Sequence, residues 1–75
     1  MLPTSLNFGQ YIAIERAIIA NDHERSAAEM RNAILSGAAD CGLIGRDFIA
    51  LPAREACILA DKISALYVEA ANPKV

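Results

Sequence analysis

The stretch 52–71, PAREACILADKISALYVEAA, decides the fold because its apolar and charged residues separate onto two sides of a helix. Apolar side chains recur every three or four residues, which is the period of an amphipathic α-helix. They are Ala56, Leu59, Ile63, Leu66, Tyr67 and Ala70, and the charged residues Arg54, Glu55, Asp61, Lys62 and Glu69 share the other side. Pro52 suits the first position of a helix, and Asn72-Pro73 ends it. The sequence therefore predicts a helix over 52–71.

A row of small residues runs beside this apolar face, at Ala53, Cys57, Ala60 and Ser64. Small side chains at such spacings let another helix approach closely. A chain of 75 residues that is 55% hydrophobic also has more apolar surface than a monomer of its size easily hides. We therefore expect a homodimer whose interface contains Ala53, Cys57, Ala60, Ser64 and Tyr67.

A first helix is predicted over about 7–20. Asn7 and Gln10 have the spacing of a capping box, in which each side chain bonds to the other's backbone N–H. The large apolar residues of one face are Phe8, Tyr11, Ile12, Ile18 and Ile19, with Ile14 at the edge of that face. We expect this face to enter the core.

A second helix is predicted over about 22–41, beginning at Asn21-Asp22 with Glu24 at the capping-box distance from Asn21. Its apolar stripe contains His23, Ala27, Met30, Ile34 and Cys41. Because the stripe resumes beyond Gly37, we expect the helix to continue through that glycine and to end at Gly42, a residue suited to a left-handed cap. A stop at Gly37 is the alternative.

The connector 42–51, GLIGRDFIAL, is too apolar for a solvated loop and has room for one short helical turn. The segment, together with Ile58, is either part of the core of the monomer or dimer, or a surface that binds a protein partner, since exposed apolar patches mark interaction sites. The expected contact residues are Leu43, Ile44, Arg46, Phe48, Ile49 and Ile58. The expected architecture is all-α: one domain over 1–75, a small bundle of three long helices plus this turn, assembled as a dimer.

Composition and charge exclude several classes of protein. The chain has only seven Gly and Pro residues and many aliphatic ones, which excludes a disordered or collagen-like chain. Its net charge of −2 argues against strong binding to nucleic acid or to an acidic membrane. The N-terminal MLPTSLNFGQ lacks a signal-peptide pattern, and no apolar run reaches the roughly 18 residues of a membrane span. We expect a cytoplasmic protein with Cys41 and Cys57 reduced, a disulfide between them being the alternative.

Three residues are candidates for site chemistry. Glu15 lies within the first apolar face. Its functional interpretation is a metal ligand or a general acid. Its structural interpretation is a side chain that lies along the edge of the core or pairs with an arginine. His23 is either a ligand or pH switch, or an ordinary residue at a helix start. Cys57 is a nucleophile or a core residue. Because phosphate-binding loops and HExxH or GxSxG motifs are absent from the sequence, we expect no enzyme, no metal and no cofactor.

The segment Ala38-Ala39-Asp40-Cys41-Gly42-Leu43, followed by Phe48 and Leu51, resembles the spacing of small and apolar residues in helix-turn-helix regulators. The resemblance covers about fifteen residues and implies that Gly45, Arg46 and Asp47 enter a DNA groove, where only Arg46 could bind bases or phosphate. The function we expect is instead a small non-catalytic regulator or inhibitor that binds a protein through an apolar helix face. A helix-turn-helix-like, DNA-binding transcriptional regulator is the alternative.

Overall fold

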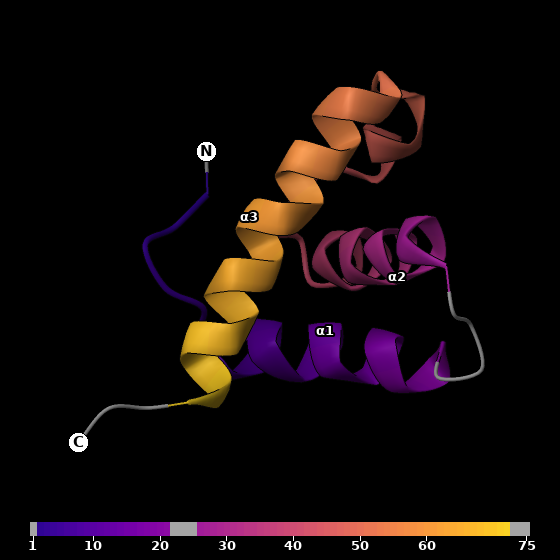
Figure 1. Ribbon diagram of the computed structural model, residues 1–75. Coiled ribbons are helices and arrows are strands. Elements are labelled where there is room, and N and C mark those ends of the chain that lie inside the picture. The colour runs from indigo at the N-terminus through magenta and orange to yellow at the C-terminus, as the bar shows by residue number, and fades with distance from the viewer. Residues whose placement is uncertain (1, 22–25, 73–75) are drawn as a thin grey trace.

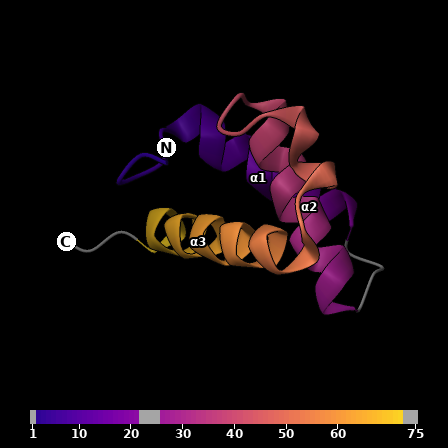
Figure 2. The same ribbon diagram turned by 90° about the horizontal axis from the view of Figure 1, so that it is seen from above.

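A computed structural model describes residues 2–21 and 26–72, and in them the protein is all-α. The helices are α1 (Phe8–Ala20), α2 (Ala27–Asp40) and α3 (Ala53–Ala71), with a short 3₁₀ helix, η1 (Arg46–Ala50), between the last two. α1 and α2 lie side by side, and α3 crosses them (Figure 1). Seen from above, α3 packs on one side of the α1–α2 pair (Figure 2). The predicted fold class and short helical turn are confirmed.

The start of α1 is the capping box that the sequence predicted. The Asn7 side chain accepts a hydrogen bond from the backbone N–H of Gln10 at 2.8 Å, and the Gln10 side chain accepts one from the backbone N–H of Asn7 at 2.9 Å. Two backbone donors that the first turn leaves without helical partners are thereby satisfied.

α2 begins at Ala27. Ser26 adopts an extended backbone conformation, and its hydroxyl accepts a hydrogen bond from the backbone N–H of Glu29 at 3.0 Å, so Ser26 is the N-cap. The predicted start at Asp22, its capping residue Glu24 and the candidate His23 lie outside the described residues. Ser26 and Glu29 have capping-box spacing themselves, which is a local signal for this helix start.

At its other end, α2 continues through Gly37 to Asp40, and the chain turns at Gly42 with φ +79°. The backbone N–H of Leu43 donates to the carbonyl of Ala38 at 2.9 Å, and that of Gly42 donates to the carbonyl of Ala39 at 3.1 Å. This is the hydrogen-bond pattern of a Schellman cap, which requires a left-handed residue at the glycine. The predicted left-handed cap is therefore confirmed.

The core lies where the helices meet, and its buried residues are Ile14, Ile34, Leu35, Ala38, Ala60 and Ile63. Ile14, which the sequence placed at the edge of the apolar face, is fully buried, whereas Phe8 and Ile19 from the middle of that face are exposed. The cause is Gly37, whose missing side chain lets the backbones of α1 and α2 touch beside Ile14. α1 is therefore turned toward α2 by close backbone packing rather than by its largest side chains.

Candidate interaction surface

The connector between α2 and α3 contributes to the core as well as to the surface. Leu43, Ile44 and Phe48 are half-buried and pack against the buried cluster. Phe48, predicted as an anchor for a partner, is thus held against the protein's own core. Its aromatic ring stabilises the fold and is only partly available for binding.

Other apolar residues of the same region do point into solvent. Ile49 of η1 is 76% exposed and Ile58 of α3 is 45% exposed, with Leu51 between them in sequence also exposed. η1 lies beside the first turns of α3, at one end of the molecule (Figure 1). We call Ile49, Leu51 and Ile58 the connector surface. Two of these three residues, Ile49 and Ile58, belong to the predicted binding set.

Arg46, the remaining residue of that set, is exposed and forms an ion pair with Asp40 at 3.2 Å. Both side chains are largely in water, so the pair contributes about 0–1 kcal/mol to stability. The five-residue η1 that contains Arg46 is short for a helix that reads a DNA groove. The local geometry therefore does not support the helix-turn-helix resemblance.

The small-residue row of α3 is only partly buried within the protomer. Ala60 is fully buried, and the Tyr67 ring stacks on Tyr11 of α1 with their centroids 5.1 Å apart. Beside the row, Asp61 accepts a hydrogen bond from Arg31 of α2 at 3.2 Å, and the Asp61 carboxylate raises the pKa of that guanidinium. Cys57 and Ser64 are half-buried, and only Ala53 is exposed. Ala60 and Tyr67 therefore contribute to packing inside the protomer, and the dimer interface stays a prediction.

An aromatic ladder, unanticipated from the sequence, joins α1 to α3. Phe8 stacks on Tyr11 with centroids 6.3 Å apart, and Tyr11 stacks in turn on Tyr67. The half-buried Glu15 carboxylate, one helical turn beyond Tyr11, raises the pKa of the Tyr11 phenol because it accepts the phenolic proton in a hydrogen bond and because of its negative charge. Glu15 thus serves the α1–α3 contact. The sequence offered one signal for this ladder, which is that Tyr11 and Tyr67 each lie on a predicted apolar helix face.

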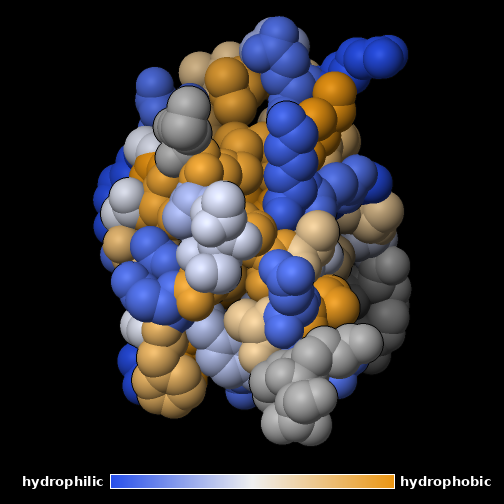
Figure 3. All heavy atoms as spheres, turned by 90° about the vertical axis from the view of Figure 1, so that its left-hand side faces the viewer, coloured by the Kyte–Doolittle hydropathy of each residue, from blue (hydrophilic) through white to orange (hydrophobic). Residues whose placement is uncertain are grey.

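The outer face of α1 is a second exposed apolar surface. Phe8 is 76% exposed and Ile19 60% exposed, and Ile12 lies between them in sequence and is half-buried. On α3, Val68 is also exposed. Figure 3 views the side that carries the N-terminal segment and the C-terminal half of α3, and it shows hydrophobic side chains at the surface between hydrophilic ones.

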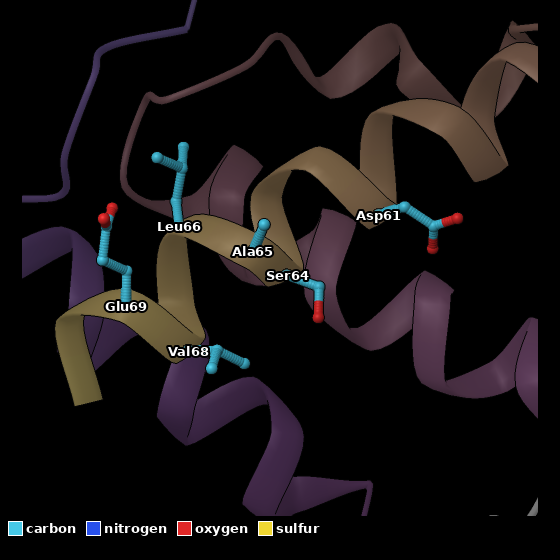
Figure 4. Close-up of a pocket in the computed structure, with 6 residues that line it drawn as sticks. All are labelled: Asp61, Ser64, Ala65, Leu66, Val68 and Glu69. Atoms are coloured by element: carbon cyan, nitrogen blue, oxygen red, sulfur yellow. The ribbon is translucent and has the colours of Figure 1, made fainter. Parts of the chain in front are cut away.

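Several hollows mark the surface. One is lined only by α3 residues, namely Asp61, Ser64, Ala65, Leu66, Val68 and Glu69, and their side chains diverge around the helix instead of converging on a point (Figure 4). Among the described residues there is no group of three or more His, Cys, Asp and Glu side chains placed to hold a metal ion. Within the same residues, none of the helices combines the length and hydropathy that crossing a membrane requires.

Comparison with known proteins adds no relative: none of the family models, curated proteins or solved structures that were compared with the chain matches it.

Proposed function

We propose that the protein is a small non-catalytic regulator that acts by binding another protein through exposed apolar helix surface. The observation that carries this proposal is the exposure of bulky apolar side chains, above all Ile49 and Phe8, in a fold that already has its own buried core. Bulky apolar side chains that stay exposed beside a completed core are candidates for contact with another protein.

The connector surface is the proposed binding site for the partner. Ile49 and Ile58 supply apolar contact, and Leu43, Ile44 and Phe48 of the same connector pack on the core and hold it in place. The exposed charges of Arg46, Asp47 and Arg54 belong to the same part of the chain and suit a polar rim. A partner would present an apolar helix or extended segment to this surface.

We further propose that the regulator works in the cytoplasm as a homodimer. The two cysteines are free thiols, which fits a reducing compartment. A dimer would cover apolar surface that the protomer leaves exposed on a face away from the connector.

The test compares partners recovered by affinity capture from the native cells with wild type and with the Ile49→Asp, Ile58→Asp double variant. A recovered protein is then purified and titrated against both. We expect the double variant to bind at least about tenfold more weakly, because charged groups would replace the buried apolar contact. A matched Lys62→Asp variant, on the exposed surface of the same helix, controls for added negative charge. Equal binding by wild type and the double variant would remove the connector surface from the proposal.

A further inference from the structure

Three apolar side chains are aligned along the outer face of α1, and we call them the apolar strip. Phe8, Ile12 and Ile19 are separated by four and seven residues. At about 100° per residue they lie within about 40° of one another around the helix axis. Phe8 and Ile19, at the two ends of the strip, remain exposed with α2 and α3 in place.

Opposite charges flank this strip. Glu15 and Arg16 are consecutive, so they project about 100° apart, and the strip runs between the two directions. The half-buried Glu15 lies on the flank next to Tyr11, and the exposed Arg16 lies on the other flank. The face is therefore apolar along its middle, negative on one side and positive on the other.

We propose that a second copy of this chain covers the strip with its own α1, and that the two helices run parallel. This inference rests on the homodimer proposed above and assigns its interface. A two-fold axis along parallel helices brings unlike flanks together, so each Glu15 meets Arg16 of the second copy. Antiparallel pairing would bring like flanks together, with Glu15 near Glu15 and Arg16 near Arg16. Charge complementarity thus selects both the occupant and its direction.

The size of the strip sets the strength of the interaction. α1 has 13 residues and is about 20 Å long, so one helix pair buries less than the roughly 800 Å² per partner of a standard interface. We expect a dissociation constant in the micromolar range, with each Phe8 against its counterpart at one end and each Ile19 at the other. Measurements at tens to hundreds of micromolar protein are therefore the informative ones.

The interface is tested by measuring the dissociation constant by sedimentation velocity for wild type and variants. Ile19→Asp should weaken the dimer at least about tenfold, because a carboxylate would be buried against an apolar strip. Ala65→Asp, which adds the same charge at an exposed position of α3, should leave the constant unchanged. Circular dichroism of each variant shows whether it is folded. A monomeric wild type, or equal dimerisation by the folded Ile19→Asp variant, would overturn the proposal.

The charge pairing has its own test, which does not disturb the apolar strip. Glu15→Arg and Arg16→Glu should each weaken the dimer, and the double variant should recover it, since the exchange restores opposite charges across the two-fold axis. The recovery distinguishes pairing between copies from the contact of Glu15 with Tyr11, which the exchange does not restore. A double variant no stronger than either single one would contradict the pairing.

The direction of the helices is tested by oxidative cross-linking in a background with Cys41→Ser and Cys57→Ser. Parallel packing predicts a disulfide between two chains that each carry Phe8→Cys. Cross-links that form only between a Phe8→Cys chain and an Ile19→Cys chain would establish the antiparallel arrangement and overturn ours. None of these outcomes bears on the connector surface, so failure of the dimer leaves the proposed partner binding to be decided by Ile49 and Ile58.

Discussion

A Cβ placed on Gly37 would lie 2.8 Å from the Cα of Ile14, so α1 and α2 are in backbone contact at that point. The same Cβ would also lie 3.0 Å from the carbonyl oxygen of Ala13 and 3.0 Å from the Cβ of Ala17. These neighbours include backbone atoms, which cannot rotate away as the end of a long side chain can. The crossing therefore requires glycine, and it orients α1 so that Ile14 enters the core.

Gly37→Ala should destabilise the protein even though alanine favours helix formation by about 1 kcal/mol. Forcing a methyl group into so close a contact typically costs about 1–3 kcal/mol, which leaves a net loss of up to about 2 kcal/mol after the gain in helix propensity. Urea unfolding followed by circular dichroism measures the difference.

Gly9→Ala is the matched control for Gly37→Ala. Gly9 is exposed in the first turn of α1, and its Cβ would meet only the Asn7 side-chain oxygen, at an ordinary 3.5 Å. This change should leave stability equal or raise it by up to about 1 kcal/mol. If the two alanine variants were equally stable, the close approach at Gly37 would not be the constraint described above.

Gly42→Ala should cost about 1 kcal/mol for a different reason, which is backbone conformation rather than space. Its φ of +79° is unfavourable for a residue with a Cβ, although no atom stands within 4 Å of the added methyl group. Gly45 has φ −75° and faces only the movable Asp47 side chain, so Gly45→Ala should be nearly neutral. Melting temperatures of the two variants, measured side by side, distinguish strain at the cap from a general cost of replacing connector glycines.

Tyr11 should titrate above the ordinary phenol value of 10.0, because the Glu15 carboxylate stabilises its protonated form. Absorbance at 295 nm in a Tyr67→Phe variant reports Tyr11 alone, and adding Glu15→Gln should lower its pKa. A pKa raised by folding stabilises the native state fully below pH 10.0, and this contribution is lost as the pH rises from there through the pKa of the folded protein. A Tyr11 pKa that is insensitive to Glu15→Gln would contradict the assigned contact.

Local signals in the sequence predicted much of the fold. The capping box at Asn7, the turn at Gly42 and the end of α3 at Ala71 each depend on residues within a few positions of one another. Pro52 was expected inside α3 and is its N-cap, a difference of one residue. Such short-range chemistry can be recognised without knowing the tertiary structure.

The orientation of the helices could not be predicted in the same way. Phe8 and Ile19 dominate the apolar side of α1 by size, yet contact with Gly37 selects the neighbouring side that contains Ala13 and Ile14. The small residues of α3 predicted close packing against another helix. Ala60 is closely packed, but within its own protomer. The pairing of helix faces depends on residues that are far apart in the sequence. The stacking of Tyr11 on Tyr67, which are 56 positions apart, is a consequence of that pairing.

Sedimentation equilibrium of the wild-type protein tests most directly whether another protein molecule covers the exposed apolar surface. The concentration should range over about 5–500 µM, which spans the micromolar affinity expected of a small interface. The account predicts a mass that rises with concentration from the protomer's 8.0 kDa toward twice that value. A mass of 8.0 kDa at every concentration would contradict it, since Phe8 and Ile19 would then be stably exposed without any self-association.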